Sequence, residues 1–186
     1  MSEAMIHLIL GPMYAEKTTN LLRHFRRFSI AKNRCLLVKY RGDTRYTDQN
    51  YIATHDRIVN TTEAIPCESL SEINQIIDKY DVIFIDEIQF YPDAIKCCQA
   101  WRQIGKIVIA CGLYTNFQRK PFDQMPELIA IADHVEFLTA ICDNCHHDNA
   151  TTSHRISDEK TERVIGGTDK YIPLCQLCYE ALKTSD

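Results

Sequence analysis

The sequence predicts an α/β fold in which a mainly parallel sheet is flanked by helices, followed by a small metal-binding subdomain. Three observations lead to this fold class. Short apolar runs alternate with stretches of helical character, a phosphate-loop pattern follows the first run, and two C-x-x-C pairs lie near the C-terminus. We expect an α/β domain over residues 1–140 and the smaller subdomain over 141–186.

The apolar runs are the candidate strands. They are short and rich in β-branched residues, as strands buried on both faces are, and they lie at 6–10, 35–38, 82–85, 107–111 and 135–138. Helices are expected at 18–31, 71–79 and 93–104. Strands that alternate with helices favour a parallel sheet with right-handed crossovers.

The composition narrows the class of protein. A chain of 186 residues with 45% hydrophobic residues can form a core, and a net charge of -4 gives no general attraction to nucleic acid or to an anionic membrane. No apolar stretch approaches the ~18 residues of a membrane span, and the N-terminus lacks the pattern of a secretion signal. The cysteines outside the C-terminal pairs are scattered, and scattered cysteines in a cytosolic protein are usually reduced and partly buried.

The first apolar run leads into a candidate phosphate loop. The pattern G-x-x-x-x-G-K-S/T is matched at Gly11, Lys17 and Thr18 but not at Glu16, where it requires glycine. In such a loop the backbone N–H groups surround phosphate oxygens, the lysine neutralises charge and the hydroxyl binds Mg²⁺. The alternative is a surface turn that opens an ordinary helix. The residues assigned to phosphate binding are Gly11, Pro12, Met13, Tyr14, Ala15, Glu16, Lys17 and Thr18.

Glu16 has two expected consequences for this loop. Its Cβ can obstruct the backbone path that glycine takes. Its carboxylate repels a triphosphate, by about 3 kcal/mol per unit charge at roughly 5 Å and an effective dielectric constant of about 20. The side chain escapes this repulsion if it points into solvent or shares the metal ion.

Two carboxylates follow the run at 82–85. Asp86 suits an aspartate that holds Mg²⁺, together with Thr18, and Glu87 suits a general base for a substrate hydroxyl. The alternative is a strand that simply ends in polar residues. The position of the pair, well after a phosphate-loop pattern, favours the functional interpretation.

The paired cysteines predict a zinc site. Cys142 and Cys145 form one C-x-x-C pair, and Cys175 and Cys178 form the other. Four thiolates complete the tetrahedral shell of Zn²⁺ and leave no open position, so the site would be structural. Four free thiols or two disulfides are the alternatives, and His146 or His147 could substitute as a ligand.

Taken in order, these segments resemble the type II thymidine kinases, from residue 6 to about 179. The segments that carry the resemblance are Gly11-Pro12-Met13-Tyr14, Lys17-Thr18-Thr19, Lys39-Tyr40, Asp43-Thr44-Arg45-Tyr46, Thr54-His55-Asp56, Asp86-Glu87-Ile88-Gln89-Phe90, Phe117-Gln118-Arg119-Lys120-Pro121-Phe122, Leu138-Thr139-Ala140 and Val164-Ile165-Gly166-Gly167-Thr168-Asp169-Lys170-Tyr171. The chain departs from the family pattern at Glu16, at Ile88 and at Tyr114-Thr115-Asn116.

The resemblance implies roles for individual residues. Glu87, Arg45 and Lys17 are the implied catalytic residues, with Glu87 as the base for the 5′-hydroxyl and Arg45 as the cation beside the transferred phosphoryl. A lasso between the cysteine pairs closes over the nucleoside. The implied nucleoside-binding residues are Met13, Asp43, Phe90, Leu113, Phe117, Phe122, Thr139, Val164, Ile165 and Tyr171. Without the family, core packing is the simpler interpretation of the aromatic residues.

The resemblance also implies an activity and partners. The leading hypothesis is ATP-dependent phosphorylation of thymidine and of deoxyuridine in nucleotide salvage, with Mg²⁺ bound with ATP and with structural Zn²⁺. The resemblance also implies a cytoplasmic homotetramer that is inhibited by dTTP. The second hypothesis is a catalytically impaired relative, with Glu16 in its loop, that binds nucleoside or nucleotide. A third, a zinc-ribbon protein that binds nucleic acid, is disfavoured by the net charge of -4.

Overall fold

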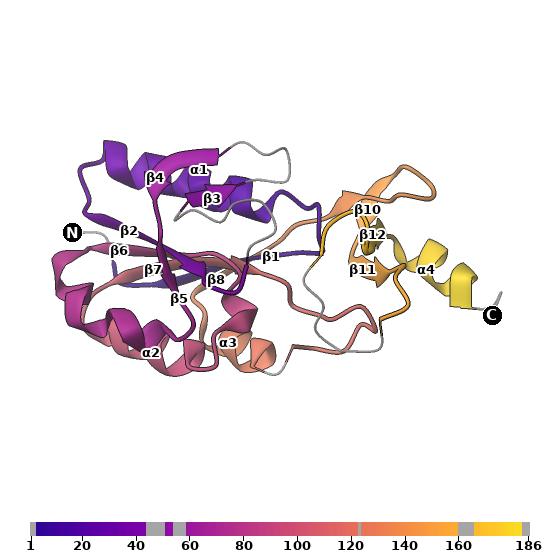
Figure 1. Cartoon of the computed structure of the whole chain (residues 1–186). Helices are drawn as coiled ribbons and strands as arrows, with labels where there is room; N and C mark the ends of the chain where they lie inside the picture. The colour runs from indigo at the N-terminus through magenta and orange to yellow at the C-terminus, as the bar shows by residue number, and fades with distance from the viewer. Residues whose placement is uncertain (1–2, 44–50, 54–58, 123, 160–165, 184–186) are drawn as a thin grey trace.

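A six-stranded sheet forms the centre of the computed structural model, which describes residues 3–43, 51–53, 59–122, 124–159 and 166–183 (Figure 1). The strand order is β5-β2-β6-β7-β1-β8, and all neighbouring strands are parallel. The strands are β1 (Ile6–Leu10), β2 (Cys35–Tyr40), β5 (Ile65–Cys67), β6 (Val82–Ile85), β7 (Ile107–Gly112) and β8 (His134–Phe137). The predicted parallel sheet is confirmed. The sequence did not predict β5, because three residues that include a proline give no apolar run.

Helices cover both faces of the sheet (Figure 1). The helix α1 (Lys17–Ile30) packs on one face, where Phe25 lies in the same apolar layer as Phe84. The other face is covered by η1 (Leu70–Lys79), α2 (Ala94–Gln103) and α3 (Met125–Ile131). Successive side chains of a strand point to opposite faces, so each strand supplies both layers. In β1, Leu8 belongs to the layer under η1, α2 and α3, and Ile9 belongs to the layer under α1.

Two of these helices differ from the sequence prediction. The helix expected at 71–79 is present as a 3₁₀ helix, η1. Leu70, Ile73 and Ile77 are buried on the side of η1 that packs on the core, and Ile76 is partly buried against it. The helix α3 was not predicted, because seven residues that include a proline are too few for a helical period to be evident.

The remaining elements are small. A hairpin joins β3 (Tyr51–Ala53) to β4 (Val59–Glu63), and a short 3₁₀ turn, η2 (Ile88–Phe90), follows β6. After the sheet come two antiparallel pairs, β9 (Ala140–Ile141) with β10 (Asp148–Ala150) and β11 (Thr152–Arg155) with β12 (Tyr171–Leu174). The chain continues into α4 (Gln176–Lys183).

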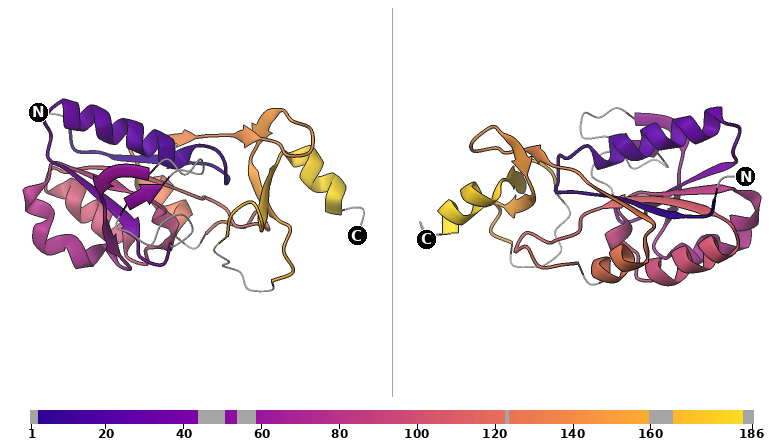
Figure 2. Two further views of the ribbon diagram at one scale, coloured as in Figure 1. Left: turned by 45° about the horizontal axis from the view of Figure 1, so that its top comes forward. Right: turned by 180° about the vertical axis from the view of Figure 1, so that it is seen from behind.

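The elements from β9 to α4 lie together at one end of the sheet in every view (Figures 1 and 2). They share a small apolar cluster that includes Cys142, Leu174 and Tyr179, and Ala15 of the phosphate loop belongs to the same cluster. This end is therefore the one at which β1 finishes. Among the helices that the structure describes, none is long and apolar enough to cross a membrane.

Candidate active site and metal site

The site is built at the carboxyl ends of three adjacent strands. In the parallel sheet, β1 lies beside β7 and β7 lies beside β6. Their ends lead into the phosphate loop, the pair Asp86 and Glu87, and Leu113. Ligands of open α/β sheets bind in this position because the carboxyl ends of parallel strands meet at one edge.

The phosphate loop follows β1 closely. A Cβ on Gly11 would lie 2.8 Å from the carbonyl oxygen of Leu138, which leads out of β8, so a larger residue would push the two segments apart. Lys17 opens α1 and is buried, and its Nζ donates a hydrogen bond to the carbonyl of Pro12 at 2.6 Å. The lysine is thus held over the loop that the sequence assigned to phosphate.

Glu16 takes the backbone conformation that glycine favours. Its φ is 54° and its ψ is 27°, in the left-handed region, and its carbonyl accepts the first helical hydrogen bond from Asn20 N at 2.9 Å. A residue with a Cβ has roughly 1–2 kcal/mol of strain in this region. The side chain is exposed. Water around the carboxylate therefore makes its repulsion of a bound phosphate weaker than it would be at a buried position.

Oxygen ligands suited to Mg²⁺ lie side by side at the start of α1 and the end of β6. Thr18 Oγ1 donates to Asp86 Oδ1 at 3.2 Å, and the Asp86 side chain is buried. The thiol of Cys111, on β7, donates to the same carboxylate oxygen at 3.0 Å. A hydroxyl and a carboxylate are hard oxygen donors of the kind Mg²⁺ prefers, so this pair fits the ion.

Glu87 is held in an unusual conformation next to Asp86. Its φ is 54° and its ψ is 48°, a left-handed position that turns the chain from β6 into η2. Gln89 donates from Nε2 to Glu87 Oε2 at 2.6 Å and accepts from the Leu113 backbone N–H at 3.0 Å. A Cβ on Gly112 would collide with the Gln89 side chain, so glycine is needed for this contact. The carboxylate is therefore fixed by a side chain to which the sequence analysis gave no role.

The predicted aromatic residues form two groups. Phe90 contacts Tyr40 with a ring-centroid distance of 5.1 Å and Phe122 at 6.5 Å. Phe117 lies under the guanidinium of Arg155, which is 3.8 Å from the ring centroid and also donates to the Tyr171 hydroxyl at 2.9 Å. Stacking and a hydrogen bond therefore both hold Arg155 in the second group.

The remaining predicted residues have varied surroundings. The backbone N–H of Met13 donates to Ser153 Oγ at 2.9 Å, and both residues are buried. Thr139 is exposed and donates to Asp148 Oδ1 at 2.8 Å. The backbone N–H of Asp43 donates to the Tyr40 carbonyl at 3.1 Å. Arg45, Val164 and Ile165 lie outside the described residues, as does the segment Thr54-His55-Asp56.

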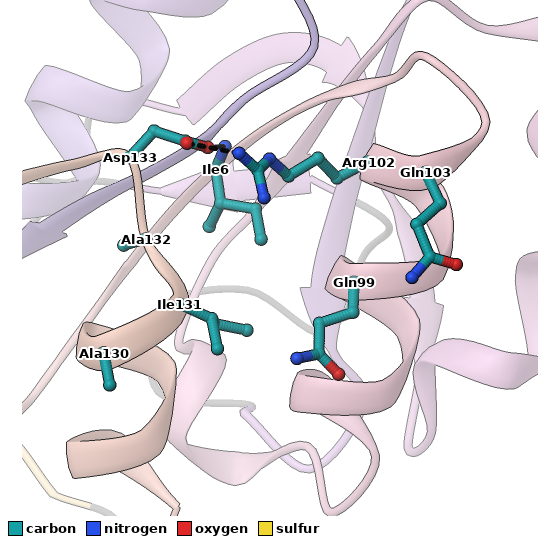
Figure 3. A pocket seen from close by; sticks show the side chains of 8 residues that line it. All are labelled: Ile6, Gln99, Arg102, Gln103, Ala130, Ile131, Ala132 and Asp133. Atoms are coloured by element: carbon teal, nitrogen blue, oxygen red, sulfur yellow. Dashed lines mark hydrogen bonds and ion pairs between the residues drawn. The ribbon is translucent and has the colours of Figure 1, made fainter.

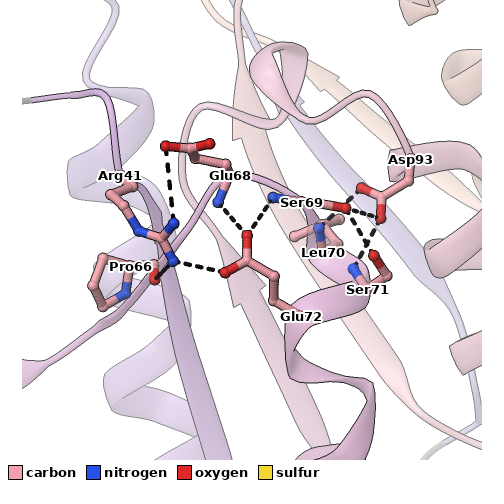
Figure 4. A network of polar contacts seen from close by, with 8 residues as sticks. All are labelled: Arg41, Pro66, Glu68, Ser69, Leu70, Ser71, Glu72 and Asp93. Atoms are coloured by element: carbon pink, nitrogen blue, oxygen red, sulfur yellow. Dashed lines mark hydrogen bonds and ion pairs between the residues drawn. The ribbon is translucent and has the colours of Figure 1, made fainter.

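An ion-pair network holds the segment that leads to Asp43 (Figure 4). Arg41 Nη2 lies 2.6 Å from Glu72 Oε2, and its Nη1 lies 3.8 Å from Glu68 Oε1. Backbone N–H groups, chiefly that of Ser69, and the Arg41 guanidinium lower the pKa of Glu72. Asp93 accepts from the backbone of Leu70 at 2.9 Å and so joins η1 to α2. The network anchors the end of β2 to η1.

A separate cavity lies at the opposite end of the sheet (Figure 3). It has a volume of about 390 Å³ and lies between α2 and α3, beside the start of β1. Arg102 Nη2 is 2.6 Å from Asp133 Oδ1, and Asp133 Oδ2 accepts from the Ile6 N–H at 2.8 Å. These contacts join β1, α2 and the start of β8, so the two charged side chains of the cavity, Arg102 and Asp133, are paired with each other.

Four thiols meet in the C-terminal region. The sulfurs of Cys142, Cys145, Cys175 and Cys178 all lie within 4.8 Å of one another. The Cys145 and Cys175 sulfurs are 3.8 Å apart. That separation is far longer than a disulfide bond of about 2 Å, and it equals the roughly 3.8 Å expected between two sulfurs of a tetrahedral zinc site. The four cysteines can thus hold one metal ion.

Four residues with clear contacts in the site were not predicted from the sequence. They are Gln89, Cys111, Ser153 and Arg155. Gln89 was part of a quoted motif, so its position offered a signal. The other three belong to unremarkable strand segments, and their partners become evident only when distant strands are placed beside one another.

Comparison with known proteins identifies the family. The sequence model described as thymidine kinase matches residues 4–179. The chain belongs to the thymidine kinase family. The resemblance inferred from the phosphate loop, the acidic pair and the cysteine pairs is therefore confirmed.

Individual members of the thymidine kinase family agree with this assignment. The human protein "Thymidine kinase, cytosolic" is 45% identical over 178 residues, which cover 96% of this chain and 74% of the human one. The thymidine kinase of Rabbit fibroma virus is 44% identical over 174 residues, which cover 94% of this chain and 95% of the viral one. The chain also resembles the solved structure of the flagellar accessory protein FlaH from Methanocaldococcus jannaschii, with a TM-score of 0.51 and 11% identity. The match covers 74% of this chain and 72% of the FlaH chain, and it shows a similarity of fold alone.

Proposed function

We propose that this protein transfers the γ-phosphoryl group of ATP to the 5′-hydroxyl of thymidine, and also accepts deoxyuridine. The observation that carries the proposal is the set of groups at the ends of β1 and β6. Thr18 and Asp86 lie within hydrogen-bonding distance, at 3.2 Å, and Glu87 is the next residue along the chain. Membership of the thymidine kinase family supports the choice of substrate.

The phosphate side of the reaction uses the loop from Gly11 to Thr18. Its backbone N–H groups surround the phosphates, and Lys17 leaves the Pro12 carbonyl to contact the β- and γ-phosphates. Thr18 and Asp86 would hold Mg²⁺, which neutralises phosphate charge when it is bound. Transfer is in line and needs no covalent intermediate, so the loop acts by position and charge.

Glu87 takes the proton of the attacking 5′-hydroxyl. The hydrogen bond from Gln89 at 2.6 Å fixes one carboxylate oxygen and supports this role, because a base must be held within reach of its proton. Arg45 steadies the transferred phosphoryl, with Asp43 nearby. The contacts of Arg41 with Glu72 anchor the segment that leads to these two residues.

The nucleoside lies between the sheet and the C-terminal region. On the sheet side we assign the thymine and sugar to Met13, Phe90, Leu113, Phe117 and Phe122. On the other side we assign the lasso residues Thr139, Val164, Ile165 and Tyr171. The contact between Phe117 and Arg155 and the hydrogen bond from Met13 to Ser153 support this arrangement, since they join the two sides.

The organisation of the molecule follows from the same assignments. We infer a kinase domain over 1–140 and a lasso subdomain over 141–186, held by structural Zn²⁺ on the four clustered cysteines. The name of the human relative supports a cytoplasmic location. We also infer a homotetramer and inhibition by dTTP from the resemblance.

A second function has one observation in its favour. The left-handed φ of 54° at Glu16 means that a residue with a Cβ stands at a strained position beside the phosphates. A protein impaired at this point would bind nucleoside or nucleotide without transferring phosphate. The exposure of the side chain favours activity instead, because a solvated carboxylate repels ATP less.

The test is formation of thymidine monophosphate from Mg-ATP by the wild type and by Glu16→Gly. We expect product from both proteins, with a KM for ATP roughly fivefold lower in Glu16→Gly, because about 1 kcal/mol of repulsion at a solvated position is removed. Glu136→Gln, a change on β8 away from the loop, is the control for loss of one carboxylate.

Each outcome of this test has a distinct meaning. Product from Glu16→Gly alone would show that the wild type is the impaired relative. If both variants fold, bind no thymidine and make no product, the proposed activity is wrong.

A further inference from the structure

The carboxylate of Asp86 receives a thiol hydrogen bond that neither the family motifs nor the phosphate loop requires. Cys111 Sγ lies 3.0 Å from Asp86 Oδ1, the same oxygen that accepts from Thr18 Oγ1 at 3.2 Å. The pairing of β6 with β7 places these two residues together. Ile85 and Ala110 are register partners in the parallel strands β6 and β7, so the next residue of each, Asp86 and Cys111, lie side by side.

The thiol is enclosed in the core of the protein. Cys111 is 1% exposed and belongs to the apolar layer beneath α1, together with Leu21 and Phe84. An ionised carboxylate can only accept hydrogen bonds, so the thiol is the donor in the 3.0 Å contact with Asp86. Cys111 therefore presents its S–H to the carboxylate.

A thiol is a suitable donor for a metal-binding carboxylate. It is neutral, so it leaves the full charge of Asp86 available to a cation, whereas a lysine or arginine would compete with that cation. It is also a weaker donor than a hydroxyl or an amide, so it fixes the orientation of the carboxylate with little loss of its basicity. Second partners of this kind commonly orient the direct ligands of a metal ion.

We propose that Cys111 is a positioning residue for Asp86, whose thiol holds Oδ1 beside Thr18 Oγ1 so that the two oxygens are ordered to receive the Mg²⁺ of Mg-ATP. The inference rests on the proposed function, because it presupposes that the loop binds Mg-ATP. Cys111 itself touches neither metal nor nucleotide in this role.

The experiment compares Cys111→Ala, which removes the donor, with Cys111→Ser, which keeps one. The matched control is Cys97→Ala, because Cys97 in α2 is also buried and its thiol also donates to a carboxylate, Asp93 Oδ2, at 3.5 Å. The primary readout is the affinity for Mn²⁺ in the presence of ATP, measured from the electron paramagnetic resonance signal of free Mn²⁺. Thymidine phosphorylation as a function of free Mg²⁺ is the second readout, and thermal melting reports on folding.

We expect Cys111→Ala to weaken Mn²⁺ binding about fivefold, the loss that one hydrogen bond represents. The Mg²⁺ concentration for half-maximal rate should rise by the same factor, while kcat at saturating Mg²⁺ stays within about twofold. Cys111→Ser should retain the affinity of the wild type, and Cys97→Ala should lower the melting temperature without a change in Mn²⁺ affinity.

The proposal is wrong if Cys111→Ala binds Mn²⁺ as tightly as the wild type does. It is also wrong if Cys97→Ala loses as much Mn²⁺ affinity as Cys111→Ala, or if Cys111→Ser loses as much as Cys111→Ala. If Cys111→Ala does not fold, Cys111→Val, which fills the space without a donor, takes its place. If the wild type phosphorylates thymidine but the variants do not differ in Mn²⁺ affinity, only the role of Cys111 is refuted. A wild type that neither binds Mn²⁺ with ATP nor makes product refutes the proposed function as well.

Discussion

The two ends of the candidate site are stabilised by different means. The phosphate loop and the acidic pair stand on a parallel sheet whose two faces are each covered by an extensive apolar layer. The region from β9 to α4 has a much smaller apolar cluster, to which the cysteines themselves belong. A region with so little apolar surface to bury needs another source of stability. The sulfur cluster supplies it if a metal is bound.

Two hydrogen bonds join the regions, in addition to the apolar contacts of Ala15. Met13 N donates to Ser153 Oγ at 2.9 Å, and the Tyr14 hydroxyl donates to the Tyr171 carbonyl at 3.2 Å. Both donors belong to the phosphate loop, and both acceptors belong to the paired strands β11 and β12. A change in the C-terminal region can therefore remove these hydrogen bonds from the loop, although the sheet beneath the loop stays folded.

Loss of the metal should have the largest effect on this comparison. We expect Cys142→Ser, or treatment with a strong chelator, to unfold the region from β9 to α4, because structural zinc contributes about 10 kcal/mol or more to small sites of this type. Amide hydrogen exchange measured by mass spectrometry should rise over 140–183 and stay low in β1, β6 and β7. Cys35→Ser, a half-buried thiol away from the cluster, is the control, and unchanged exchange after verified loss of the metal would contradict the expected role.

Removal of the proposed base should leave both regions folded and stop the chemistry. Glu87→Gln keeps the shape of the side chain but cannot accept the proton, so we expect the rate of transfer to fall by about 10²–10⁴. Thymidine affinity, measured by calorimetry, should stay within about twofold. Rates from single-turnover assays that match the wild type would exclude Glu87 as the base.

The smallest expected effect comes from the contact between the regions. Ser153→Ala removes the buried acceptor of the Met13 N–H and should lower the free energy of unfolding by about 1 kcal/mol. Amide exchange at Met13 should become faster, as measured by NMR, while exchange in β6 is unaffected. Ser157→Ala removes an exposed hydroxyl contact with Glu159 and should change neither quantity. If Met13 stays protected in Ser153→Ala, the contact does not join the regions.

The difference between the regions also decides what the sequence could predict. The runs at 6–10 and 82–85 are buried on both faces, so their composition alone indicated β1 and β6. Once these strands are parallel, Lys17, Thr18 and Asp86 must meet at one edge. The spacing of the cysteines likewise predicted a common site, and the structure brings all four sulfurs together.

The missed residues depend on register and on contacts between distant segments. Cys111 reaches Asp86 because β6 and β7 pair in one particular register. Arg155 is buried because Phe117 and Tyr171 surround its guanidinium. A lone cysteine or arginine in a short apolar or polar segment carries no sign of such a partner. The domain limits and the roles assigned to the individual site residues stay predictions, and Arg45, Val164 and Ile165 lie outside the described residues.

The hydrogen bond between Met13 and Ser153 spans 140 residues of chain, and that between Tyr14 and Tyr171 spans 157. During synthesis the last strand of the sheet, β8, is complete at Phe137, before either acceptor has been made. Chains grow at about 5–20 residues per second and fold from the N-terminus. The sheet can therefore form seconds before the loop after β1 makes these two contacts, so a nascent chain completes its main core before the C-terminal region is in place.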